Sequence, residues 1–133
     1  MFEWNPQYSV GIASIDAQHQ VLFAIGRELY SAMGSGQGKA AVGPVLERLV
    51  RYTKTHFEHE EQLLSKNAYP DLQNHKKKHN GFTDRIVQFQ EDYAAGRIGV
   101  TIELLEFLRD WLVNHIQQED VAYTPCLKGK AVN

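Results

Sequence analysis

Residues 72–93, LQNHKKKHNGFTDRIVQFQEDY, hold the pattern that decides the fold. Apolar and histidine side chains recur there at alternating spacings of three and four residues, which is typical of one face of an α-helix. The positions on this face are Leu72, His75, His79, Phe82, Ile86, Phe89 and Tyr93. At about 100° per residue, Lys77 points nearly opposite the histidines, and Lys76 and Lys78 flank the face. The lysine run is therefore predicted to face water, and both histidines to face the core.

Proline, glycine and capping residues divide the rest of the chain into further helices. Asp16 is a candidate N-cap for the first helix, and a glycine-rich loop ends it. The Tyr69-Pro70 step separates the second helix from the third, and Pro125 is expected to close the ordered chain. The predicted helices cover residues 17–34, 40–66, 70–95 and 99–119. With no alternating segment of strand length bounded by hairpin turns, the chain is expected to be all-α.

Length and composition indicate one ordinary domain over residues 1–133, with an arm over 1–16 and a C-terminal segment over 120–133. Hydrophobic residues make up 43% of the chain, and the formal net charge is only -2. This charge gives no broad positive field for nucleic acid or membrane surfaces. The N-terminus lacks a secretory signal and no apolar run is long enough to span a membrane, so a cytoplasmic protein is predicted. The single cysteine, Cys126, is expected to be a free thiol.

Every predicted helix places histidine on its apolar face. In the second helix His56 and Glu60 share that face, and His19 and His115 lie on the faces of the first and fourth helices. Of the six histidines, only His59 lies beside the apolar face of its helix instead of on it, so it is interpreted as a surface or outer residue. One buried histidine is more often a hydrogen-bonded core residue than a metal ligand. Burying five imidazoles with a carboxylate is costly unless bound cations compensate, and a metal centre is therefore predicted.

The ligand types favour particular metals. A structural zinc site takes about four ligands, preferably thiolates, and a helical zinc protease has glutamate after its first histidine, where this chain has Lys76 after His75. A single zinc is therefore a poor match. Imidazoles with carboxylates suit a pair of roughly octahedral ions, as in di-iron or di-manganese bundles.

Five stretches of the chain resemble the hemerythrin family, specifically the single-domain bacterial hemerythrins. They are Phe2-Glu3-Trp4, GIASIDAQH from Gly11, HFEHEE from His56, YPDLQNHKKKH from Tyr69 and FLRDWLVNHIQQEDVAY from Phe107. The resemblance extends over nearly the whole chain. It implies an up-down-up-down four-helix bundle preceded by an N-terminal arm.

The same resemblance implies a ligand set for two iron ions joined by a hydroxo or oxo group. It places His75, His79 and His115 on one iron, and His19 and His56 on the other. Glu60 and Asp120 are expected to bridge the two ions. On octahedral ions this set leaves one position open, on the iron with fewer histidines, and the resemblance implies that dioxygen binds there.

Reversible dioxygen binding, for oxygen storage, delivery or sensing, is therefore the predicted function, with transport as one form of delivery. The alternative is a di-iron enzyme acting on peroxide, nitric oxide or ferrous iron, and a non-catalytic iron or zinc store is a third reading. The histidine-rich ligand set argues against an enzyme. The expected partners are dioxygen and an oxygen-consuming enzyme or a reductase, with no nucleic acid, and the chain is expected to be a monomer.

Four apolar residues match positions around the dioxygen pocket of the family: Phe57, Trp111, Leu112 and Ile116. They would exclude water from the bound ligand, although apolar residues at helical spacing are also ordinary core.

Geometry and resemblance disagree at one position. Residues five apart on an ideal helix are separated by about 140°, and residues four apart by about 40°. A regular helix would therefore place Glu119 beside His115, whereas the resemblance places Asp120 there. A wide turn or a helix end would swing Asp120 inward, and the prediction is that the chain deviates in this way.

Overall fold

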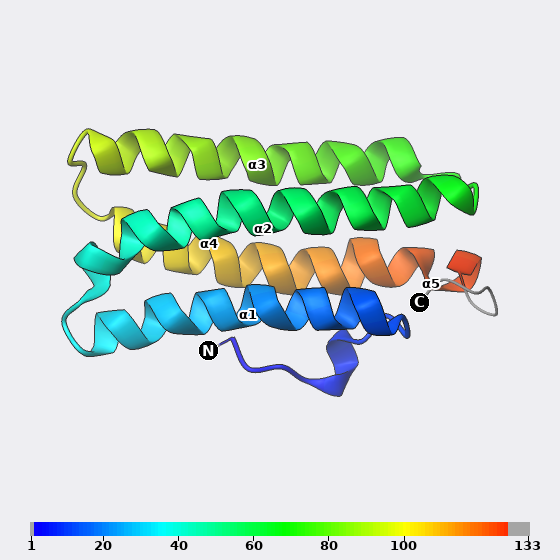
Figure 1. Cartoon of the computed structure of the whole chain (residues 1–133), viewed down its shortest axis with the longest axis horizontal. Coiled ribbons are helices and arrows are strands. Elements are labelled where there is room, and N and C mark those ends of the chain that lie inside the picture. Colours follow the sequence, from blue (N-terminus) through cyan, green and yellow to red (C-terminus); the bar gives the residue numbers. More distant parts are fainter. Residues whose placement is uncertain (1, 128–133) are drawn as a thin grey trace.

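The computed structural model describes residues 2–127, which form a bundle of long helices preceded by an arm (Figure 1). The bundle helices are α1 (Ala13–Gly34), α2 (Gly38–Lys66), α3 (Leu72–Ala94) and α4 (Val100–Asn114). They run alternately in opposite directions and are joined by short loops (Figure 1). The predicted all-α, up-down-up-down bundle is confirmed. Within residues 2–127, no helix combines the length and apolar character that a membrane crossing requires.

The N-terminal arm packs against α1. It contains a short 3-10 helix, η1 (Pro6–Tyr8), and its Phe2 ring fills the space above Gly26 of α1. A Cβ atom at Gly26 would lie 2.4 Å from the Phe2 ring, so only glycine allows this contact. The Arg27 side chain also donates a hydrogen bond to the Phe2 carbonyl oxygen at 2.8 Å. The arm is thereby fixed along the bundle.

The first helix begins earlier than predicted. α1 starts at Ala13, so Asp16 lies inside the first turn and the prediction that it is the N-cap is wrong. Its carboxylate accepts hydrogen bonds from the Val10 backbone N–H at 2.9 Å and from the Ser9 hydroxyl at 2.5 Å. An acidic side chain is favourable in the first turn, where the helix dipole is positive. Asp16 therefore joins the arm to α1 instead of capping the helix.

The last helix continues farther than predicted. After α4 the chain stays helical through a π-helical turn, η2 (His115–Asp120), and a short helix, α5 (Val121–Leu127), which contains Pro125. The expectation that Pro125 closes the ordered chain is therefore wrong. Buried Tyr123 and Leu127 pack with the apolar side chains of α1 and α2, and this packing stabilises α5 despite the missing proline N–H. Residues 128–133 of the predicted C-terminal segment lie outside the described residues.

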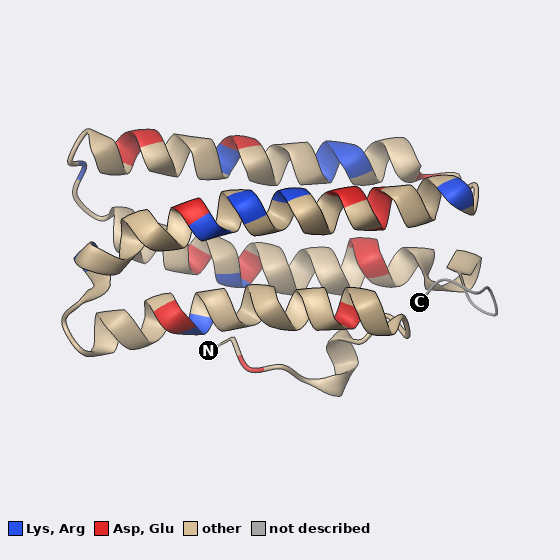
Figure 2. Cartoon of the chain, viewed as in Figure 1, with Lys and Arg blue, Asp and Glu red and all other residues tan. Residues whose placement is uncertain are grey.

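The apolar core runs along the bundle axis, and Lys, Arg, Asp and Glu residues are distributed along all four bundle helices (Figure 2). Lys77 and Lys78 are exposed and Lys76 is half-buried, so the prediction that the lysine run faces water is confirmed. Tyr93, which was placed on the core face of the third helix, is 37% exposed. It lies in the last turn of α3, where its hydroxyl donates to the Lys39 carbonyl oxygen at 3.3 Å.

Candidate metal centre

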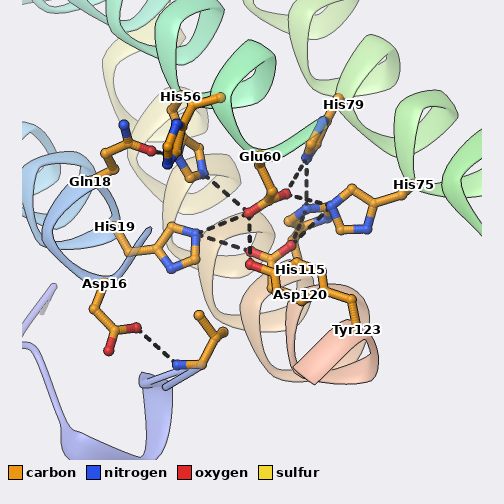
Figure 3. A network of polar contacts seen from close by, with 12 residues as sticks. Asp16, Gln18, His19, His56, Glu60, His75, His79, His115, Asp120 and Tyr123 are labelled. Atoms are coloured by element: carbon orange, nitrogen blue, oxygen red, sulfur yellow. Dashed lines mark hydrogen bonds and ion pairs between the residues drawn. The ribbon is translucent and has the colours of Figure 1, made fainter. Parts of the chain in front are cut away.

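Seven buried side chains converge in the half of the bundle where α1 and α3 begin (Figures 1 and 3). Their ligand atoms form two groups, within each of which all atoms lie within 4.8 Å of one another. The larger group contains Glu60, His75, His79, His115 and Asp120, and the smaller contains His19, His56 and Glu60. Each of these side chains is at most 6% exposed. The structure therefore brings together every residue that the sequence predicted as a metal ligand.

Local helix geometry places these side chains. His56 and Glu60 on α2, and His75 and His79 on α3, are four residues apart, so each pair projects from one helix face. His115 and Asp120 are five apart and lie at the two ends of the π-helical turn η2.

The wide turn rotates Asp120 toward the core, where it is 0% exposed. Glu119 remains half-buried at the surface. The predicted deviation from a regular helix is therefore present, and it brings Asp120 to the site.

The carboxylate of Glu60 faces both groups. Its Oε1 lies 2.5 Å from Nε2 of His75 and 3.1 Å from Nε2 of His79. Its Oε2 lies 3.7 Å from Nε2 of both His19 and His56. One oxygen is therefore directed at each group.

Asp120 has the same arrangement from the opposite side. Its Oδ1 lies 3.1 Å from Nε2 of both His75 and His115, and its Oδ2 lies 3.0 Å from Nε2 of His19. All five imidazoles thus present Nε2 to the interior, and both carboxylates lie between the two groups. Two metal ions bound here could share both carboxylates as ligands.

The contacts among these side chains leave several polar atoms without hydrogen-bond partners. Five buried atoms have no hydrogen-bond partner among the described residues: both ring nitrogens of His19, Nδ1 of His75 and both carboxylate oxygens of Asp120. In addition, Nε2 of His79 and Nε2 of His115 lie only 3.2 Å apart. Buried polar atoms without partners are costly, and bound cations would satisfy the inward-facing ones. The imidazole and carboxylate donors suit borderline ions such as ferrous iron, so these residues fit a pair of irons.

Burial and the contacts among these residues oppose each other in setting their pKa values. Burial would lower the pKa of His19, but the nearby carboxylates of Asp120 and Glu60 raise it to about 9. Burial would also lower the pKa of His75, but its contacts with Asp120 and Glu60 raise it to about 10. Burial lowers the pKa of His56 to about 4. Burial would raise the pKa of Glu60, but contacts with His19 and His75 hold it well below its usual range.

Three further residues contact the site and were not found from the sequence. The Gln18 Oε1 atom accepts a hydrogen bond from Nδ1 of His56 at 2.7 Å. Glu61 Oε2 lies 2.8 Å from Nδ1 of His79, and the Tyr123 hydroxyl donates to Glu60 Oε2 at 3.1 Å (Figure 3). Tyr123 follows Asp120 by three residues. This spacing would have indicated that both lie on the same helix face, had the helix been predicted to continue past Asp120.

His59 lies outside both groups. Its Nε2 is 3.0 Å from the Ser14 hydroxyl, so it connects α2 to α1 beside the centre. This position is consistent with its interpretation as an outer residue.

Aromatic rings cover the larger group. Phe57 stacks on His79 with ring centroids 3.8 Å apart, and Trp111 stacks on His115 at 4.2 Å. Leu112 and Ile116 are each 1% exposed and belong to the same apolar core as Phe57. On the outer side, a surface pocket of about 360 Å³ reaches Trp111 and His115.

Comparisons with known proteins agree with this geometry. Residues 10–127 match the family model described as the hemerythrin HHE cation binding domain. The chain is 36% identical to a bacteriohemerythrin of Stenotrophomonas maltophilia, covering 95% of this chain and 81% of that protein. It is 31% identical to a bacteriohemerythrin of Methylococcus capsulatus, covering 92% and 93%.

A solved structure of wild-type hemerythrin superposes with a TM-score of 0.85 at 30% identity, over 96% of this chain and 98% of that one. The chain therefore belongs to the hemerythrin family of non-haem di-iron, dioxygen-binding proteins.

Proposed function

We propose that seven residues of this chain hold the di-iron centre and that it binds dioxygen reversibly. His75, His79 and His115 would bind one iron, and His19 and His56 the other. Glu60 and Asp120 would bridge the two ions. The observation that carries this assignment is the position of the two buried carboxylates, each of which directs one oxygen at each group.

Iron bound here supplies electrons and an open coordination position for dioxygen. The open position would lie on the side of His19 and His56, because this group provides fewer imidazoles. The chain itself fixes the ligands: the stacked rings of Phe57 and Trp111 hold the imidazoles of His79 and His115 in orientation.

Water exclusion is the second contribution of the chain. Phe57, Leu112 and Ile116 are at most 6% exposed, and a dry apolar wall stabilises a bound neutral ligand against displacement by water and anions. We assign these residues, together with Trp111, to the dioxygen pocket.

The physiological role that fits this site is oxygen storage, delivery or sensing, not catalysis. All candidate ligands come from one chain, so the site needs no second copy, and a monomer is sufficient. An oxygen-consuming enzyme or a reductase is the expected partner.

Metal content tests the assignment. Protein produced with ample iron is expected to contain about two irons per chain, because five imidazoles and two carboxylates exceed the needs of one octahedral ion. Iron should be measured by elemental analysis together with zinc and manganese. One tightly held zinc with no iron uptake would contradict the proposal.

A further inference from the structure

Each group of candidate ligands has one imidazole whose outer nitrogen is hydrogen-bonded to a side chain of a neighbouring helix. In the larger group, Glu61 of α2 contacts Nδ1 of His79 on α3 at 2.8 Å. In the smaller group, Gln18 of α1 contacts Nδ1 of His56 on α2 at 2.7 Å. By contrast, Nδ1 of His19 and Nδ1 of His75 have no hydrogen-bond partner among residues 2–127. The two outer contacts are therefore a distinct feature of the site.

The two acceptors fix the imidazoles in the form that a metal needs. An amide oxygen and a carboxylate oxygen both accept hydrogen bonds, so each holds the ring proton on Nδ1 and leaves Nε2 free to face the interior. The packing of α1, α2 and α3 sets these contacts, because each acceptor and its histidine come from adjacent helices.

The acceptors differ in charge. A carboxylate attracts the Nδ1 proton more strongly than an amide does, and this makes the ring a more basic and more electron-donating ligand. Glu61 is 24% exposed and Gln18 is half-buried, so neither contact is fully screened by solvent.

We propose that Glu61 and Gln18 are positioning residues that make the two iron positions electronically unequal. Glu61 increases electron donation to the iron position held by three histidines, and this favours ferric iron there. Gln18 orients the ligand of the other position without adding negative charge, at the iron where dioxygen binds. This inference rests on the proposed function, because it assumes the ligand assignment given above.

Exchanging charge without changing shape tests the inference. Glu61→Gln removes the negative charge and keeps an acceptor oxygen, and Gln18→Glu adds the charge in the same place. The midpoint reduction potential of the iron-loaded protein is expected to rise in E61Q and to fall in Q18E. Loss of ferric iron to a chelator should be about tenfold faster in E61Q, at the lower end of the effects known for such outer contacts.

Two matched controls separate this effect from a general change of charge. Glu58→Gln and Gln20→Glu make the same substitutions at exposed positions on α2 and α1. They are expected to leave the potential and the rate of iron loss at the parent values.

Two results would overturn the inference. If all variants bind iron like the parent, but E61Q and Q18E have the potentials of their controls, the inference fails and the proposed function stands. If the parent itself takes up no iron, the proposed function fails and the inference fails with it.

Discussion

At the scale of single residues, the contacts of the centre converge on Glu60. Its carboxylate is 0% exposed and contacts four imidazoles and the Tyr123 hydroxyl. A buried charge of this kind is stable only while its partners remain. The loss of one histidine should therefore affect both metal binding and the stability of the bundle.

Replacing His75 or His56 by alanine is expected to strip iron from the protein, because either change removes an inward-facing Nε2 atom. In the metal-free chain, His75→Ala should also lower the free energy of unfolding by about 3–5 kcal/mol, the usual cost of leaving a buried charge without its partner. Elemental analysis and urea denaturation measure the two effects.

His59→Ala is the control for these variants. His59 contacts Ser14 and lies outside both ligand groups, so this variant should keep its iron. Equal iron loss in all three variants would show that the sixth histidine has been misassigned.

At the scale of elements, the π-helical turn η2 decides which acidic residue reaches the site. Both carboxylates of the Glu119-Asp120 pair are adjacent in sequence, but only Asp120 is fully buried. Asp120→Ala should therefore lose iron or the absorption band of the oxygenated form, whereas Glu119→Ala should keep both. The reverse pattern would mean that the turn is regular in solution and that the assignment fails at this residue.

The buried face that α4 and η2 share supplies a further prediction. Shortening Leu112 or Ile116 to alanine opens space in the wall proposed to exclude water, so autoxidation to the diferric form should become several-fold faster while iron content holds. Leu108→Ala is the control, because Leu108 is equally buried one turn earlier on the same helix. Rates that match this control would make Leu112 and Ile116 ordinary core residues.

The helices also show which features can be predicted from the sequence and which cannot. The alternation of three and four in residues 72–93 predicts both the helix and the burial of His75 and His79, because side-chain direction within one helix follows from its geometry alone. The contacts of Gln18 and Glu61 depend instead on how adjacent helices pack, which spacing within a single helix does not determine.

The ends of helices are harder to predict for the same reason. Local capping and helix-breaking preferences predicted that Asp16 caps a helix and that Pro125 ends the ordered chain, but tertiary contacts outweigh both preferences. Asp16 instead accepts hydrogen bonds from the arm, and the burial of Tyr123 and Leu127 carries α5 past Pro125. Tyr123 was missed as a contact of Glu60 because it follows the predicted end of the fourth helix.

At the scale of the whole molecule, the bundle surrounds a polar centre with an apolar core. Three helices, α1, α2 and α3, together with η2, direct imidazoles and carboxylates inward, and the rings of Phe57 and Trp111 stack on the larger group. This architecture suits the proposed binding of a small ligand at a site shielded from water.

The most direct test of reversible dioxygen binding is an absorption spectrum recorded during repeated cycles of oxygenation and deoxygenation of the iron-loaded protein. The expected result is a visible band that forms with dioxygen, disappears when dioxygen is removed, and returns in the next cycle at nearly full height. A single irreversible change to the diferric spectrum, or sustained turnover of peroxide with a reductant at rates far above free iron, would contradict the central claim.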